Sequence, residues 1–548
     1  MAKNLSTMSG VSKKASAQTH QTSKAKKGQK KNNAGGYVFK ISGWERLNRF
    51  LILGSEGGTY YVSEKKLSKQ NASNILKLIK EDGKRVVDTL VEVSREGRAA
   101  KNDPALFVLA LAASCNNIET RKYALSKLQE VARIGTYLFT FVSYVDSLRG
   151  WGKGLQKAIQ KWYNQPLSKL AFQVCKYPSR KIENELPWTH RDLLRKIHIK
   201  PGSEKQNIIF KYVAKGREAF SDEEWNLLQT DKDLRYIWAH EAAKICESPK
   251  DIVPIIKEYG LVRESIPPEI IKSKTVYDQL VINMPVTATL RNLGVMTNIG
   301  TIKSLSKETD IVVERLTDLE TLRKGRVHPL SVLAALKIYA AGQGFRGNLS
   351  WKPVDQIKDA LDKCFDLSFK AVEPTGKRYL LGVDVSGSMS WEAISGIDCL
   401  CPAEAAAAMA MIIARTEPKY KIMGFSHKFV DLGITAKQSL DTILRKTRSM
   451  NFGSTDCALP MIFAKENNLD VDVFVVITDN ETYFGNQHPF HALQEYRRVS
   501  GINAKLAVIG MTATQFSIAD PEDSGMIDVV GMNVDTPNII AEFAKGSF

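Results

Sequence analysis

The hydrophobic pattern of the chain changes near residue 377, and this change limits the folds that it can adopt. From about residue 40 to 370 apolar residues recur every three or four positions, as in the stripe Leu138, Phe141, Val142, Val145 and Leu148. From about 377 onward, short apolar runs alternate with helical stretches. Because such alternation is typical of a parallel sheet covered on both faces, we predict a helical part followed by a doubly wound α/β domain.

The distribution of charge supports the same division. Residues 1–36 contain eight lysines and no acid, residues 37–378 carry a net charge of +17 and residues 379–548 a net charge of −7. We predict a flexible basic tail at 1–36, a stack of helical repeats at 37–370 and an α/β domain at 377–548. The tail would either add affinity for nucleic acid or only solubilise the chain. The excess of basic residues in the helical part predicts a polyanionic partner, because each neutralised phosphate releases counterions.

Several classes of protein are disfavoured by the composition. Seven cysteines, odd in number and scattered, do not form a disulfide framework and favour a reducing compartment. The sequence predicts neither secretion nor a membrane helix, because no apolar run approaches about 18 residues. It offers no nucleophile paired with a base, so we expect no catalysis. A nuclease using Asp384 and Asp479 is the alternative, but two metal ions would need more carboxylates than these.

Two predicted helices carry basic faces. In the helix over 153–162, Lys153, Lys157 and Lys161 recur at every fourth position, opposite an apolar side. The next begins near Thr189 and is expected to end by Pro201. Its buried side would hold His190, Leu194 and Ile197, with His190 packed in the core. Its other side would present side chains that contact phosphates, namely Arg191, Arg195 and His198.

A possible metal site follows the first predicted strand, Tyr379 to Asp384. Asp384, Ser386 and Ser388 alternate on a loop made tight by Gly387, and ligands with only oxygen donors select a hard cation such as Mg²⁺. Together with 453–456 and 478–481, this segment resembles the metal-ion-dependent adhesion site of von Willebrand factor A domains. The resemblance implies that Ser386, Ser388 and Thr455 are ligands, that Asp384 and Asp479 act mostly through water, and that a partner's carboxylate completes the shell. The alternative is an A fold whose site is empty or only structural.

The helical part also resembles a known family. The segments that carry the likeness are 97–101, 106–111, 144–154, 188–201, 284–294 and 328–329, which look like the TROVE module. With the A domain behind it, the chain over about 37–548 is similar to the Ro autoantigen family. The resemblance implies a closed ring of HEAT-like helical repeats whose ends are joined by the A domain.

The same resemblance implies a function. Family members bind small noncoding Y RNAs on the outside of the ring and single-stranded 3′ ends of misfolded RNA in its central hole. They act in RNA quality control, in some cases with an exonuclease such as polynucleotide phosphorylase. The family's RNA contacts map onto Lys176, Arg180 and His198. We expect a cytoplasmic monomer, with the nucleus as an alternative in a eukaryotic host. The competing function is a protein-interaction scaffold that works mainly through the metal site.

Overall fold

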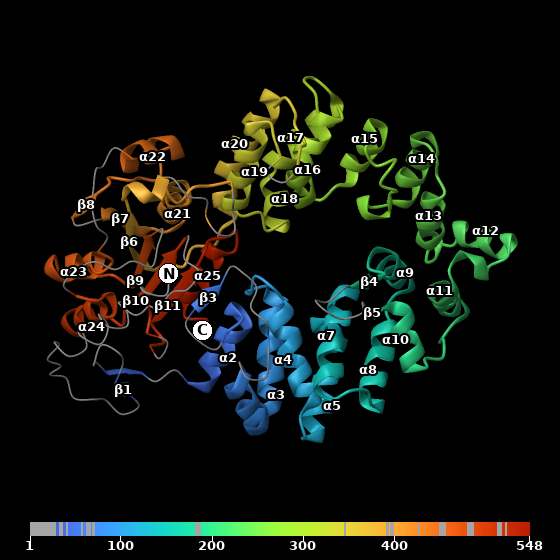
Figure 1. Cartoon of the computed structure of the whole chain (residues 1–548), viewed down its shortest axis with the longest axis horizontal. Helices are drawn as coiled ribbons and strands as arrows, with labels where there is room; N and C mark the ends of the chain where they lie inside the picture. Colours follow the sequence, from blue (N-terminus) through green and yellow to red (C-terminus); the bar gives the residue numbers. More distant parts are fainter. Residues whose placement is uncertain are drawn as a thin grey trace.

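The computed structural model is a ring of helices closed by an α/β domain (Figure 1). It describes residues 29–31, 37–39, 42–55, 59–61, 67, 72–180, 188–344, 347–390, 394, 399–425, 428–448, 456–478, 487–511, 518–520 and 523–548. The predicted basic tail lies largely outside these residues. One described segment of it, β1 (Gln29–Lys31), pairs antiparallel with β2 (Tyr37–Phe39).

The ring is built from helices that follow one another in chain order (Figure 1). Its first half contains α2 (Gly43–Leu53), α3 (Ser73–Glu96), α4 (Asp103–Ser114), α5 (Ile118–Ser126), α6 (Leu128–Val131), α7 (Gly135–Leu148), α8 (Lys153–Tyr163), α9 (Leu167–Lys176) and α10 (His190–Ile197). A two-residue ladder, β4 (Ser179–Arg180) and β5 (Trp188–Thr189), separates α9 from α10.

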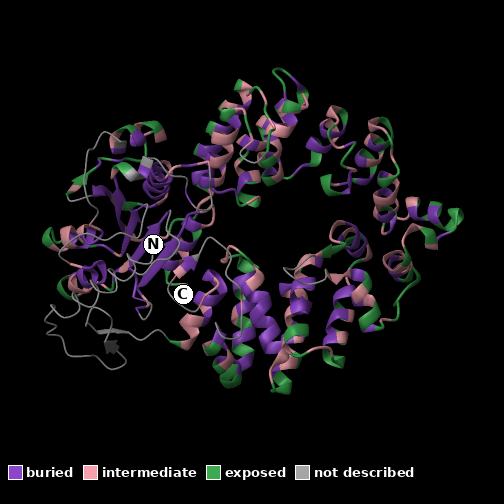
Figure 2. Cartoon of the chain, viewed as in Figure 1, coloured by how far each residue is buried: buried purple, intermediate pink, exposed green. Residues whose placement is uncertain are grey.

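The second half of the ring returns to the α/β domain. It contains α11 (Glu204–Lys215), α12 (Asp222–Thr230), α13 (Arg235–Lys244), α14 (Pro249–Tyr259), α15 (Lys274–Asn283), α16 (Val286–Asn298), α17 (Lys307–Thr317), α18 (Leu319–Lys324), α19 (Pro329–Ala341) and α20 (Asp355–Ser368). Short 3₁₀ turns lie at η2 (Arg217–Ala219), η3 (Arg263–Ser265) and η4 (Phe369–Ala371). Figure 2 shows that buried residues run along most of these helices, and α4 is buried from Pro104 to Ala113.

The α/β domain is a seven-stranded sheet in the order β3-β11-β10-β9-β6-β7-β8. Neighbouring strands are parallel except for the antiparallel pair β7–β8. The strands are β3 (Thr59–Tyr61), β6 (Arg378–Asp384), β7 (Lys419–Phe425), β8 (Phe429–Asp431), β9 (Val473–Thr478), β10 (Lys505–Gly510) and β11 (Met526–Val530). The helices are α21 (Pro402–Thr416), α22 (Leu440–Arg448), α23 (Leu459–Glu466), α24 (Pro489–Ser500) and α25 (Thr536–Lys545), with the 3₁₀ turn η5 at Gly387–Ser390.

The sheet has a hydrophobic core on each face, as the apolar runs predicted. Alternate strand residues belong to different cores: Leu381 packs with α21, α22 and α25, whereas Leu380 packs with α23 and α24. The first of these cores continues into the helical ring. The predicted fold class, a helical repeat region followed by a doubly wound A-type domain, is confirmed.

Both ends of the helical region contact the α/β domain, and this closes the ring. On one side β3, from the segment assigned to the helical region, pairs with β11. Arg49 of α2 is fully buried there, and its Nη2 donates to the carbonyl oxygens of Asp523, Ser524 and Met526 at 3.2 Å each. On the other side Lys337 of α19 forms an ion pair with Glu404 of α21.

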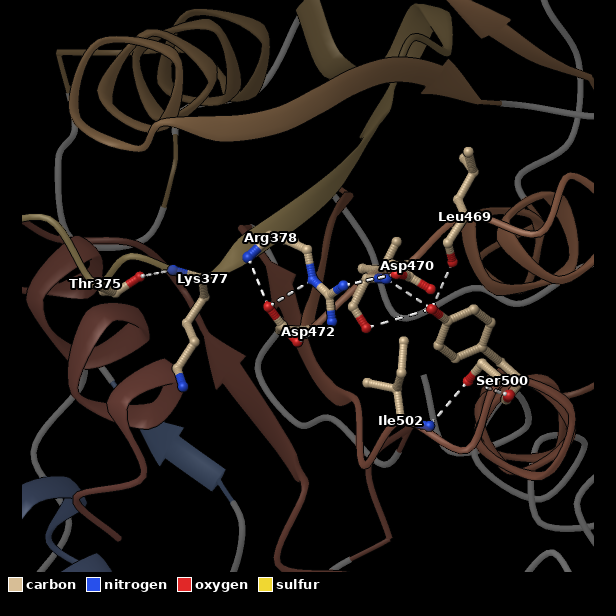
Figure 3. Close-up of polar contacts among 10 residues, drawn as sticks. Thr375, Lys377, Arg378, Leu469, Asp470, Asp472, Ser500 and Ile502 are labelled. Carbon is tan, nitrogen blue, oxygen red and sulfur yellow. Dashed lines mark hydrogen bonds and ion pairs between the residues drawn. The ribbon is translucent and has the colours of Figure 1, made fainter.

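The strands β6 and β9 are held in register where they begin (Figure 3). The Arg378 guanidinium donates to Asp472 from Nε at 3.0 Å and from Nη2 at 2.8 Å, and to Asp470 from Nη1 at 2.9 Å. These ion pairs hold the pKa of the Asp472 carboxyl below its usual value. Parallel strands that start together also end together, so the end of β6 lies beside the end of β9.

Candidate functional site

The helix α10 presents the basic side chains predicted to contact phosphates. It begins with a capping box, in which Asp192 N donates to Thr189 Oγ1 at 3.1 Å and Thr189 N donates to Asp192 Oδ2 at 3.1 Å. Arg191, Arg195 and His198 are all exposed, as predicted. The buried side is made by His190, Leu193 and Ile197. Leu194, predicted on this side, is half-buried and packs at the edge of the same core. The fully buried residue between His190 and Ile197 is Leu193, which was not predicted, because the inward stripe steps by three residues from His190 and then by four.

The helix ends earlier than the sequence predicted. His198, not Pro201, terminates it, with φ 49° and ψ 44° in the left-handed region. Left-handed backbone is uncommon for residues other than glycine and raises the free energy of the folded chain. It turns the chain away from the helix axis and leaves the His198 side chain exposed.

The helix α8 fixes the C-terminal end of α10. Gln156 Nε2 donates to the Lys196 carbonyl at 2.9 Å, and Gln160 Nε2 donates to the Ile197 carbonyl at 2.7 Å. These bonds satisfy carbonyl groups that a helix end leaves unpaired. Lys153 and Lys157 flank Gln156 along α8 and are exposed. The two helices are therefore packed together and carry five exposed basic or imidazole side chains, which we call the α8–α10 basic cluster: Lys153, Lys157, Arg191, Arg195 and His198.

Lys176 and Arg180 lie at the other end of α10. Lys176 ends α9, with its Nζ 5.4 Å from the ring centre of Phe172 and 5.5 Å from that of Tyr177. Arg180 lies opposite Trp188 in the β4–β5 ladder, which leads directly into α10. Its Nη2 is 3.3 Å from Asp103 Oδ1, so one donor already has a carboxylate partner. The length of α10, about 12 Å for eight residues, separates Arg180 from His198.

His190 is a core residue, as the sequence predicted. Its side chain is buried, and its Nδ1 is 2.7 Å from the Tyr163 hydroxyl. The rings of Phe139 and Trp162 lie 4.8 and 6.0 Å away between centres. Burial lowers the pKa of His190 to about 3, so the imidazole is neutral at physiological pH. It supports α10 from beneath and is not available to a ligand.

Three further side chains near the cluster were missed by the sequence analysis: Trp151, Trp188 and Lys196. Trp151 lies just before α8, Trp188 just before the cap of α10, and Lys196 in the last turn of α10. The available signal was that each tryptophan directly precedes a basic helix. Such neighbours matter because aromatic rings next to cations are common in sites for single-stranded nucleic acid.

The candidate metal site lies at the shared end of β6 and β9. Asp384 is buried; Ser386 N donates to its Oδ1 at 2.8 Å, and Thr478 Oγ1 donates to its Oδ2 at 2.9 Å. Ser386 is half-buried, and Ser388 belongs to η5. Thr455, Asp479 and the side chain of Ser388 lie outside the described residues. The described part of the chain contains no group of three His, Cys, Asp or Glu residues that could hold a metal. A fixed carboxylate beside a serine is an oxygen donor set that suits Mg²⁺ and its bound waters.

Comparisons with known proteins match both parts of the chain. The family model for the TROVE domain matches residues 30–338, and the model for the Ro60 vWA domain matches residues 378–544. The chain belongs to the Ro60 family. A curated relative, RNA-binding protein RO60 of Deinococcus radiodurans, is 40% identical over 96% of this chain and 97% of its own. RNA-binding protein RO60 of Caenorhabditis elegans is 35% identical over 96% of this chain and 91% of its own.

A solved structure of this family agrees with the ring architecture. The crystal structure of the Deinococcus radiodurans RO (RSR) protein has a TM-score of 0.85 and 40% identity, covering 92% of this chain and all of that one. These relatives are named as RNA-binding proteins and not as enzymes. Within the described residues, no helix is both long and apolar enough to span a bilayer.

Proposed function

We propose that this member of the Ro60 family binds RNA through the α8–α10 basic cluster, with Lys176 and Arg180 at its edge. The observation that carries the proposal is the exposure of five cationic or imidazole side chains on two packed helices, none of which has a carboxylate partner among the described residues. Cations without such partners are free to pair with phosphates. The TROVE match and the names of the relatives support the same function.

In finer terms, we propose that the protein binds Y-like noncoding RNAs on the outer surface of the ring. Single-stranded 3′ ends of misfolded RNAs would enter its centre. It would act without catalysis, as a cytoplasmic monomer in RNA quality control, and deliver RNA to an exonuclease. The closed ring and the excess of basic residues in the helical part support this role.

We further propose that the A domain binds Mg²⁺ at the end of β6, through Ser386, Ser388 and Thr455, with Asp384 and Asp479 acting through water. What supports this is the buried Asp384 carboxylate, oriented by two hydrogen bonds. A carboxylate from a protein partner would complete the shell. Calorimetric titration with Mg²⁺ should give heat for the wild type and none for Asp384→Ala. Equal heats would contradict this site.

A salt-titrated gel shift tests the RNA proposal. The probe is a structured small RNA with a single-stranded 3′ tail, compared with the same RNA lacking the tail. Tail-dependent, salt-sensitive binding that weakens in His198→Ala supports the proposal. Equal, weak binding of both RNAs, unchanged in His198→Ala, would contradict it and favour the second candidate function, a scaffold that works through the metal site.

A further inference from the structure

Two tryptophans and a lysine lie together beside the α8–α10 basic cluster. The ring centres of Trp151 and Trp188 are 5.7 Å apart, with an interplanar angle of 45°. Lys196 Nζ lies 5.0 Å from the Trp151 ring centre and 5.8 Å from that of Trp188. Both rings are half-buried and Lys196 is exposed. Aromatic surface and positive charge therefore meet at one accessible place.

Trp151 and Trp188 pack at the edge of the core and are less buried than a neighbouring core tryptophan. Trp162, one helix away, is buried, and its Nε1 donates to the Ala132 carbonyl at 2.6 Å. The Nε1 of Trp151 is shielded from solvent and has no hydrogen-bond partner among the described residues. An indole N–H without an acceptor destabilises the folded chain, so such groups are usually paired. The packed Trp151 ring thus keeps an indole N–H donor that no described residue of the protein accepts from.

The surroundings are hydrogen-bonded and positively charged. Trp188 is fixed by the β4–β5 ladder, and the Lys196 backbone is fixed by Gln156 of α8. Lys153 and Arg195 are neighbours in sequence of Trp151 and Lys196. Within the described residues Lys196 has no carboxylate partner, so its ammonium contacts only the two rings. A cationic ligand would be repelled here, whereas an aromatic group attached to an anion would be attracted.

We propose that Trp151, Trp188 and Lys196 form a stacking site for an unpaired nucleobase of RNA. The proposal rests on the proposed RNA-binding function and adds to it a contact with a base. The base stacks on the exposed ring surface, and the flexible Lys196 side chain moves from the rings to the adjoining phosphate. Because every base has an aromatic face, the site selects single-stranded segments and not a particular sequence.

Ring deletion tests the site in the full-length protein. Trp188→Ala and Trp151→Ala should weaken binding of a tailed hairpin RNA about tenfold to a hundredfold at fixed salt. The dependence of affinity on salt should stay unchanged, because stacking releases no counterions. Trp188→Phe, which keeps a ring, should retain most of the affinity. The matched control is Trp44→Ala, since Trp44 is also half-buried, with the Arg85 guanidinium 4.0 Å from its ring centre.

A second arm changes the RNA, and its wild-type measurement does not depend on how the variants fold. Abasic nucleotides replace the unpaired positions of the hairpin, segment by segment. Abasic replacement of one segment should weaken binding by the wild type about as much as Trp188→Ala weakens binding of the intact RNA. The Trp188→Ala variant should bind the intact RNA and that abasic RNA equally. Equal binding of intact and abasic RNA by the wild type would overturn the stacking site, as would equal effects of Trp188→Ala and Trp44→Ala. Failure of the wild type to bind RNA in a salt-dependent way would instead overturn the proposed function.

Discussion

Removing two arginines from α10 should change RNA binding by an amount that can be calculated beforehand. Arg191 and Arg195 are exposed, and neither has an ion pair among the described residues. Each phosphate contact adds about 0.7 to 0.9 to the slope of log K against log salt. The double variant Arg191→Ala/Arg195→Ala should therefore reduce the slope by about 1.4 to 1.8, and lower the affinity about 20-fold at 0.15 M salt.

Fluorescence polarisation with a labelled hairpin RNA, from 50 to 400 mM KCl, measures both quantities. The matched control is Lys250→Ala/Lys257→Ala on α14, which removes the same charge from exposed positions elsewhere on the ring (Figure 1). The free energy of unfolding should change by less than about 0.5 kcal/mol in either variant. Equal loss of slope in both variants would refute the reasoning, because the charge of the whole ring would then matter and not the α8–α10 basic cluster.

Three further predictions concern stability. His198→Gly should raise the free energy of unfolding by about 0.5 to 1 kcal/mol in urea titrations, because glycine relieves the left-handed backbone, while RNA binding weakens; lower stability would contradict this. As the pH falls from about 6 to 4, His190 should lower the free energy of unfolding by about 1.4 kcal/mol per pH unit. The reason is that the imidazole binds a proton in the unfolded chain but stays neutral in the folded site, where its pKa is about 3. The same titrations should show a shallower pH dependence for His190→Phe, and an unchanged one would count against the buried neutral imidazole. Arg49→Met should lower the stability by about 3 kcal/mol and enlarge the radius of gyration in X-ray scattering, since three carbonyl groups lose their donor; an unchanged radius would show that Arg49 does not hold the ring closed.

The sequence predicted the central strands of the sheet because they are buried on both faces. Such strands are continuous apolar runs, and β6 begins one residue before its predicted start and ends at its predicted end, Asp384. In β11 the run is interrupted by Asp528, whose burial raises its pKa to about 8 and which accepts a hydrogen bond from Ala519 N at 3.0 Å. The three-residue β3 is defined by its partner almost 470 residues later in the chain, so no local pattern predicts it.

The candidate RNA site was predicted to the extent that it depends on a single helix. The period of α10 identified its exposed basic side. The end of the helix at His198 depends on side chains of α8, and the contact of Arg180 with Asp103 depends on α4. The Trp151–Trp188 pair joins segments 37 residues apart, which the contact of α8 with α10 brings side by side. Contacts between elements therefore account for what the sequence analysis missed.

Photo-crosslinking tests the central claim most directly. A hairpin RNA carrying 4-thiouridine in its unpaired segments is bound to the full-length protein and irradiated, and the crosslinked peptides are identified by mass spectrometry. The claim predicts crosslinks within 151–163 and 188–198, which diminish in Arg191→Ala/Arg195→Ala. Crosslinks confined to residues 378–548, unaffected by that substitution, would contradict it.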